Sequence, residues 1–172
     1  MSKNPCPNDY PLTNNTDVHI VLYVVTPCGA IDFFLDGTNM ADSNESRNKT
    51  RVLKAFDTLF NKRDYAEAEQ YWSPQYIQHS AHIKPGREGL FDLVKSLPPT
   101  LRYEPGVIVA EGDFVILHGR FSGFGQPVNW IAADILRIEN GILMEHWDVI
   151  QDEATREQSK SGHPMFGEDF PH

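Results

Sequence analysis

The chain has 172 residues, enough for one domain with a buried core, and a formal net charge of −9 with histidines neutral. An acidic chain without a cluster of lysine and arginine argues against a nucleic-acid partner. The two cysteines, Cys6 and Cys28, suit neither a disulfide framework nor a zinc site of known spacing. The longest apolar stretch, 18–25, is too short to cross a membrane and follows no basic leader, so we expect a cytoplasmic protein without a membrane partner.

The first 45 residues differ in character from the rest of the chain. Residues 1–16 are polar and rich in turn-forming Asn and Pro, which is typical of a mobile terminus. The apolar run 18–25 is a candidate strand, and 30–35 is a second short apolar run. Since no pattern holds throughout, we predict that 1–45 is an atypical or poorly ordered extension.

Three helices are predicted after the extension. Between 46 and 61 the apolar residues follow helical spacing, at Val52, Leu53, Phe56, Leu59 and Phe60. A short helix over 66–72 follows Asp64, a plausible cap, and a third helix runs from Pro85-Gly86 to Lys95. A short extended segment, 76–79, lies between the second and third helices.

The second half of the chain reads as strands. The predicted strands cover 101–109, 114–121, 128–138 and 142–151, and Asn140-Gly141 between the last two is a strong hairpin signal. Helices followed by consecutive strands predict an α+β fold, with the helices on one face of a curved antiparallel sheet. The polar segment 152–172 is expected to pack back onto the domain through Met165, Phe166 and Phe170.

Polar side chains interrupt the apolar faces of the last two strands. Counting by two, Asp134 shares a face with Trp130 and Leu136, and His146 shares a face with Asp148 and Ile150. A carboxylate or imidazole on an apolar face is costly unless it is paired. These residues are therefore either polar core groups with hydrogen-bond partners or functional groups that line a pocket.

Five short motifs resemble the SnoaL-like polyketide cyclases of the nuclear transport factor 2-like superfamily. They occur in family order over about 46–166, as Tyr76-Ile77-Gln78-His79, Gly86-Arg87-Glu88-Gly89, Ala133-Asp134-Ile135-Leu136-Arg137, Asn140-Gly141 and Glu145-His146-Trp147-Asp148. The resemblance implies a cone-shaped fold with an interior pocket, spanning 46–151 here. Residues 17–40 depart from the family pattern and look like an insertion.

The resemblance also implies a chemistry. The family's characterised cyclases close a ring by an intramolecular aldol reaction without metal or organic cofactor, using a pocket carboxylate as acid and base. By its place on the penultimate strand, Asp134 resembles that carboxylate, and burial would raise its pKa. The alternative is a structural acid paired with Arg120 or Arg137.

The remaining candidates surround Asp134 in the predicted pocket. His118, on the adjacent strand, is expected to orient Asp134 or polarise the carbonyl, and a satisfied core histidine is an equal alternative. Substrate contacts are expected from Tyr76, His79, Phe121, Trp130, His146 and Asp148. For His146 and Asp148, a bond between neighbouring strands is an alternative. His79 and His82 lack a convincing third ligand, so we expect no metal.

Three functions remain open at this point. The leading one is cofactor-free acid/base catalysis, cyclisation or isomerisation, on a small carbonyl compound. A non-catalytic ligand-binding or dimerisation module is the second, because fold does not imply function. Hydrolysis, as of an epoxide, by Asp134, Asp148 and His118 ranks third. An apolar sheet face carrying Ile131, Ile135, Trp147 and Val149 predicts a homodimer.

Overall fold

The computed structural model describes residues 20–25, 31–36 and 43–167, and the chain divides into two units, Met1–Ala41 and Asp42–His172. In the first unit, β1 (Ile20–Val25) and β2 (Ile31–Asp36) form an antiparallel pair in which Val25 lies opposite Ile31. The rest of the predicted extension, and Phe170 of the tail, lie outside the described residues. Among the described residues, the helices are all too short or too polar to cross a membrane.

The first helix of the second unit is α1 (Asn44–Phe56), which continues as a π-helix, η1 (Asp57–Lys62). Ser43 caps α1 because its Oγ accepts a hydrogen bond from the N–H of Ser46 at 3.2 Å. Together α1 and η1 correspond to the helix predicted over 46–61. The π-helix ends where Arg63 adopts a left-handed conformation with φ of 57°.

The second helix is shorter than predicted. Helix α2 (Tyr65–Ala68) is capped by Asp64, but it ends before Trp72, which begins strand β3 (Trp72–Gln78). The prediction of a helix up to Trp72 is therefore wrong. Strand pairing takes over here: Trp72 is the register partner of Leu143, and the N–H of Leu143 donates to the carbonyl oxygen of Tyr71 at 2.8 Å.

The third helix, α3 (Gly86–Ser96), agrees with its prediction to within a residue. Its buried side has the spacing of an amphipathic helix and carries Leu90, Phe91 and Val94. The guanidinium group of Arg63 donates to the carbonyl oxygens of Val94, Leu97 and Pro98. This arginine satisfies carbonyl groups that the end of α3 leaves without helical partners.

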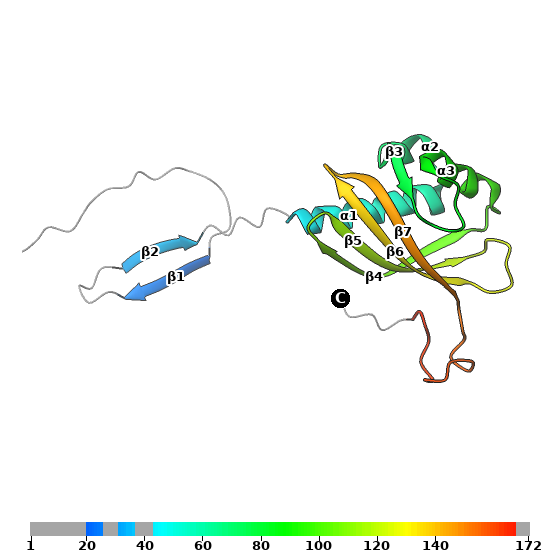
Figure 1. The fold of residues 1–172 in the computed structure, drawn as a ribbon. Coiled ribbons are helices and arrows are strands. Elements are labelled where there is room, and N and C mark those ends of the chain that lie inside the picture. Colours follow the sequence, from blue (N-terminus) through cyan, green and yellow to red (C-terminus); the bar gives the residue numbers. More distant parts are fainter. Residues whose placement is uncertain (1–19, 26–30, 37–42, 168–172) are drawn as a thin grey trace, which may run out of the picture. The chain divides into compact units, whose positions relative to one another are not determined.

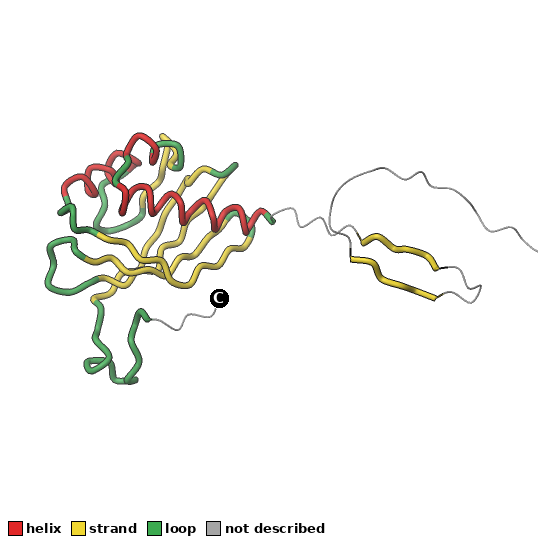
Figure 2. The backbone as a smooth tube through the Cα atoms, turned by 180° about the vertical axis from the view of Figure 1, so that it is seen from behind, coloured by secondary structure: helices red, strands yellow, loops and turns green. Residues whose placement is uncertain are grey.

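Five strands form one curved sheet in the order β3-β7-β6-β5-β4 (Figure 1). The four long strands are β4 (Arg102–Glu111), β5 (Phe114–Ser122), β6 (Trp130–Glu139) and β7 (Ile142–Asp152). These four are antiparallel as predicted, but β3 pairs parallel with β7, so the sheet is mixed. The helices lie on one face of the sheet, as the view from behind also shows (Figure 2). The predicted α+β class is confirmed.

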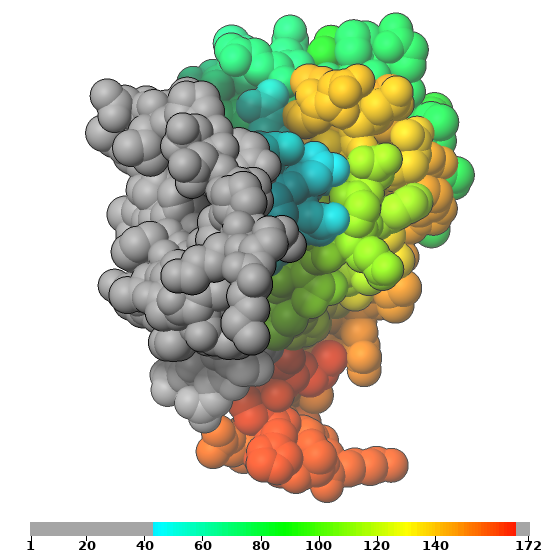
Figure 3. All heavy atoms as spheres, turned by 90° about the vertical axis from the view of Figure 1, so that its left-hand side faces the viewer, coloured from blue at the N-terminus to red at the C-terminus, as the bar shows by residue number. Residues whose placement is uncertain are grey.

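The two faces of the sheet have different roles. On the inner face, Leu117, Leu136 and Leu143 are fully buried against the helices. On the outer face, Ile116 and Val149 are exposed. Helix α1, cyan in Figure 3, is hydrogen-bonded to two turns of the sheet. Nδ2 of Asn48 donates to the carbonyl oxygen of Gly112 in the β4–β5 turn at 3.2 Å, and Nε of Arg51 donates to the carbonyl oxygen of Gly141 in the β6–β7 turn at 2.8 Å. These bonds hold the helix across one end of the sheet.

Candidate functional site

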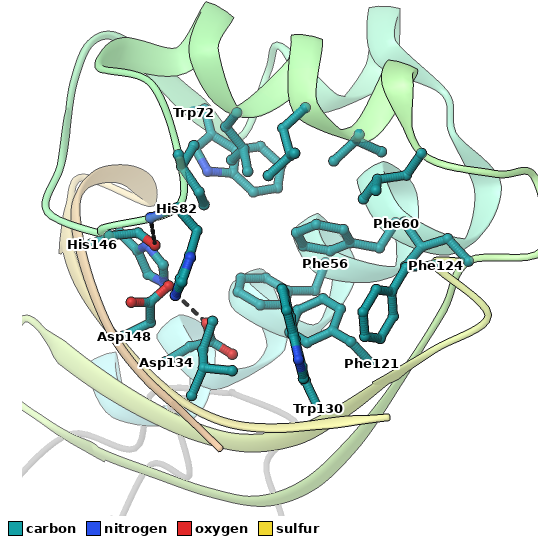
Figure 4. Close-up of a pocket in the computed structure, with 18 of the residues that line it drawn as sticks. Phe56, Phe60, Trp72, His82, Phe121, Phe124, Trp130, Asp134, His146 and Asp148 are labelled. Carbon is teal, nitrogen blue, oxygen red and sulfur yellow. Dashed lines mark hydrogen bonds and ion pairs between the residues drawn. The ribbon is translucent and has the colours of Figure 1, made fainter. Parts of the chain in front are cut away.

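A cavity of about 310 Å³ lies between the inner face of the sheet and the helices (Figure 4). Most of its wall is aromatic or aliphatic: Phe56, Phe60, Trp72, Tyr76, Ile83, Leu90, Leu93, Val94, Leu97, Leu101, Phe121, Phe124, Trp130 and Ile150. The polar part of the wall consists of Ser80, His82, Gln126, Asp134, His146 and Asp148. An apolar cavity with a few converging polar groups is the usual form of a small-molecule site.

Asp134 and His146 form a buried pair on this wall. Oδ1 of Asp134 lies 3.0 Å from Nε2 of His146, and the two residues are only 3% and 5% exposed. Burial raises the pKa of the Asp134 carboxyl, and the bond to His146 opposes part of that rise. The second oxygen, Oδ2, is buried and has no hydrogen-bond partner among the described residues.

A second carboxylate lies next to Asp134. Asp148 of β7 is its register partner across the β6–β7 pair, so both side chains project from the inner face of the sheet. The charge of Asp148 adds to the rise in the pKa of Asp134. The two arginines considered as partners of Asp134 are paired with other acids. Nη2 of Arg120 lies 2.6 Å from Oε2 of Glu104, and Nε of Arg137 lies 2.9 Å from Oε2 of Glu145.

A hydrogen-bonded chain continues from His146 to the edge strand. Nδ1 of His146 lies 2.9 Å from Oε1 of Gln78, and the same oxygen accepts a hydrogen bond from the N–H of Ser80 at 2.9 Å. Gln78 therefore lies behind the pair rather than on the cavity wall. In the sequence, Gln78 stands out only as part of the family motif at 76–79.

Aromatic rings build the wall that faces the carboxylates. Trp130 and Phe124 have ring centroids 4.6 Å apart, and Phe121 meets Phe60 edge-on at 5.2 Å. Tyr76 is 4% exposed, and burial raises the pKa of its phenol, so the hydroxyl stays protonated. Of the predicted substrate contacts, Tyr76, Phe121, Trp130, His146 and Asp148 all line this cavity.

His118 does not reach the cavity, and its predicted role beside Asp134 is wrong. In the β5–β6 register Leu117 lies opposite Asp134, whereas His118 lies opposite Ala133 on the outer face. There the His118 ring lies 5.7 Å from that of Phe166 in the C-terminal tail. The alternative water-activating set of Asp134, Asp148 and His118 is not assembled for the same reason.

His79 also belongs to the outer face, so its predicted contact with substrate is wrong. Its neighbour Ile77 lies two positions earlier on the strand and is the register partner of the outer-face residue Glu145. The His79 ring stacks on Trp147 with centroids 4.8 Å apart, and its Nε2 lies 2.9 Å from Oε1 of Glu145. Side chains two residues apart in an extended segment point to the same face, and this alternation continues one residue past the end of β3, so His79 lies on the same face as Ile77.

His82 was not among the expected substrate contacts. It lies on the cavity wall, and its ring centroid is 5.7 Å from that of Trp130. His79 and His82 thus lie in different surroundings, and in the described part of the chain no three potential ligand side chains converge. Phe124 and Gln126, from the loop before β6, were also missed, because loop residues have no periodicity to reveal their direction.

Solved structures resemble this fold. A candidate ketosteroid isomerase from Kribbella flavida aligns with a TM-score of 0.55 and 15% identity, over 62% of this chain and 79% of that one. A candidate polyketide cyclase from Acidithiobacillus ferrooxidans aligns with a TM-score of 0.54 and 17% identity, over 63% and 91%. AclR, a candidate hydroxylase from Streptomyces galilaeus, aligns with a TM-score of 0.51 and 26% identity, over 62% and 90%.

Comparison with curated proteins gave no match. The family comparison, in contrast, matches the SnoaL-like domain over residues 52–146, a range that begins in the last turns of α1, includes β3, α3, β4, β5 and β6, and ends within β7. This range also contains Asp134 and ends at His146. The cone-shaped fold expected of the nuclear transport factor 2-like superfamily is confirmed, and the chain belongs to the SnoaL-like domain family.

Proposed function

We propose that this protein catalyses cofactor-independent acid/base chemistry on a carbonyl compound, an aldol-type cyclisation or an isomerisation, with Asp134 as the proton acceptor. The observation that carries the proposal is the asymmetry of this carboxylate. His146 holds Oδ1, whereas the buried Oδ2 has no partner among the described residues, on the wall of an apolar cavity. A desolvated carboxylate with a free oxygen is a stronger base than one in water.

The reaction would begin when Oδ2 of Asp134 removes a proton from the carbon next to a carbonyl group. The electron pair of that C–H bond moves into the enolate, whose oxygen needs a hydrogen-bond donor. The protonated hydroxyl of Tyr76 lies on the same cavity wall and is our candidate donor. In a cyclisation the enolate carbon attacks a second carbonyl, and the new alkoxide takes the proton back from Asp134; in an isomerisation another carbon takes it.

The cavity wall narrows the class of substrate. Its aromatic side suits a compact cyclic or planar compound, and its polar side carries two carboxylates. Among the lining residues that the structure describes there is no lysine or arginine. Relatives named as candidate cyclases and a candidate isomerase are compatible with this class, although at their low identity they support the fold alone.

The test is proton exchange from carbon, which precedes either reaction. A panel of small ketones and diketones is incubated with the protein in heavy water, and exchange next to the carbonyl is followed by NMR. Asp134→Asn should slow exchange about 100-fold or more, the usual contribution of a general base. The matched control is His118→Ala, which should leave the rate unchanged because His118 lies on the outer face.

Two results would contradict the proposal. Full exchange by Asp134→Asn would exclude Asp134 as the base. Tight binding of panel compounds with no exchange above buffer would favour the alternative, a ligand-binding module of the same fold.

We also propose a homodimer, formed through the outer face of the sheet. Of the residues expected there, Val149 is 68% exposed, Ile135 and Trp147 are half-buried, and Ile131 is buried. Phe114 and Ile116, at 45% and 43% exposed, extend this apolar surface. A large exposed apolar patch favours association. The cytoplasmic location stays a prediction from the sequence.

A further inference from the structure

We propose that Gln78 is a positioning residue that keeps a proton on Nδ1 of His146, so that Asp134 and His146 hold one further proton between them. The inference concerns the ground state of the protein and needs no substrate. Its consequence for catalysis rests on the function proposed above. It follows from three hydrogen bonds, taken in order from the backbone inward.

The first bond sets the direction of the Gln78 amide. The N–H of Ser80 is a backbone donor, and it lies 2.9 Å from the amide atom that faces it. A donor must face an acceptor, so that atom is Oε1 and not the amino group. The opposite assignment would place two donors against each other.

The second bond then sets the form of His146. The same Oε1 lies 2.9 Å from Nδ1 of the imidazole. Since Oε1 can only accept, Nδ1 must carry a proton and donate it. A neutral His146 with its single proton on Nε2 would put two lone pairs against each other at this distance.

The third bond gives the proton count of the pair. With Nδ1 protonated, Nε2 faces Oδ1 of Asp134 at 3.0 Å, and one proton must lie between them. It rests on Nε2, giving imidazolium and carboxylate, or on Oδ1, giving neutral imidazole and carboxylic acid. Both arrangements leave the pair without net charge.

The surroundings favour an uncharged pair. Asp148 of β7 is the other charged group on this part of the inner face, and Tyr76 of β3 and His82 of the following loop complete the titratable groups on the cavity wall. Without Gln78, His146 can carry its proton on Nε2 and donate to an ionised Asp134. The pair is then negative and lies beside the carboxylate of Asp148, which is unfavourable in a poorly solvated site.

The orientation of the Gln78 amide leaves one of its polar groups without a hydrogen bond in the described part of the chain, which indicates that the two bonds made by Oε1 are the important ones. Its Nε2 group is buried and has no hydrogen-bond partner among the described residues. A buried amide with one idle end is unusual. Glutamate at this position would keep both acceptor bonds without the idle donor, so Gln78→Glu is the conservative variant.

The experiment measures the protonation of each ring nitrogen of His146 by heteronuclear NMR of the full-length protein. His146→Gln identifies the signals. The expected result for the unmodified protein is a protonated Nδ1 from about pH 5 to pH 8, the range in which a free histidine changes charge. Gln78→Leu should move the proton to Nε2, Gln78→Glu should keep it on Nδ1, and Gln75→Leu, on the exposed part of the same strand, should change nothing.

An unprotonated Nδ1 in the unmodified protein would overturn the proposal, even if Gln78→Leu did not fold. The same tautomer in the unmodified protein and a folded Gln78→Leu would also overturn it. If carbon-proton exchange is found, Gln78→Leu should lower kcat about tenfold with little change in KM, and Gln78→Glu should restore it in part. If the NMR signals are as expected but no carbon-proton exchange occurs, the proposed catalytic function is rejected and the proposed protonation of His146 stands. If exchange depends on Asp134 but Nδ1 of His146 is unprotonated, the catalytic function stands and the proposed protonation is rejected.

Discussion

Asp134 and Asp148 lie directly opposite each other on β6 and β7, and both carboxylates line the same cavity. Asp134 shares a proton with His146 in our proposal, whereas Asp148 has no lysine or arginine beside it among the lining residues that the structure describes. The carboxylate of Asp148 therefore adds negative charge to the wall that no lysine or arginine of the described lining offsets. An anionic ligand would bring like charge into a poorly hydrated space.

This charge predicts a preference for uncharged ligands. Of two compounds of nearly equal shape, methyl benzoate should bind at least about tenfold more tightly than benzoate, because an unpaired buried charge is costly. Titration calorimetry at neutral pH measures both affinities. Asp148→Asn should narrow the gap, and equal or tighter binding of benzoate by the unmodified protein would contradict the prediction.

Asp134→Asn should stabilise the fold increasingly as pH rises. Burial raises the pKa of Asp134 above its ordinary value of 3.8. Ionising this carboxyl therefore costs more free energy in the folded protein than in the unfolded chain, and asparagine removes that cost. Below pH 3.8 the carboxyl is protonated in both states and the variant gains nothing by this route. Urea unfolding at several pH values measures the difference, with Asp113→Asn, an exposed residue, as control. A difference that stays constant with pH would refute this account.

Val149→Glu should convert the proposed dimer to a monomer. Val149 is 68% exposed on the outer face, so the substitution leaves the core intact while placing a charge in the proposed interface. Light scattering at micromolar concentration gives the mass of each protein. Val149→Thr, similar in shape and uncharged, should remain dimeric. A monomeric unmodified protein would exclude the proposed packing.

Asn61→Ala should destabilise the protein by about 1–3 kcal/mol. The Asn61 amide bonds both backbone groups of Tyr103: Nδ2 donates to its carbonyl oxygen at 3.0 Å, and Oδ1 accepts from its N–H at 2.8 Å. Alanine leaves both groups without these partners and detaches η1 from β4. Denaturant unfolding measures the loss, and Asn44→Ala, at an exposed position of α1, should change stability far less.

Glu145→Gln should destabilise the fold at neutral pH but not in acid. The bond to His79, followed by that to Arg137, lowers the pKa of Glu145 below its ordinary value of 4.5. The stabilisation is therefore present above pH 4.5 and is lost as pH falls through the lowered value. Unfolding measurements across this range should show the two proteins converging in acid. The exposed Glu69→Gln corrects for the change in net charge.

Much of the fold could be predicted from local patterns. Asn140 and Gly141 have φ values of 52° and 77°, as a tight hairpin turn requires, and the turn joins β6 to β7 as expected. Alternation within each strand correctly put Asp134 among apolar residues and His146 beside Asp148. These signals are reliable because each depends on residues close together in the chain.

The faces of separate strands could not be related in the same way. His118 and Asp134 were assigned to one face, but a seven-residue loop joins β5 and β6, and the register that follows puts Ala133 opposite His118. A shift of one residue exchanges the faces of a strand. The same uncertainty applied to His79, whose position depends on the parallel pairing of β3 with β7.

The sequence by itself determined the class of fold, the hairpin, the family and the presence of a carboxylate on an apolar strand face, because period, turn chemistry and motifs are local. Only the tertiary structure decided which groups meet that carboxylate. In the structure the neighbour of the carboxylate is His146 rather than His118, and Gln78 lies behind His146. Arg120 and Arg137 pair with other acids. The physical reason is that strand register and the packing of loops are set by the whole core, and no single segment carries that information.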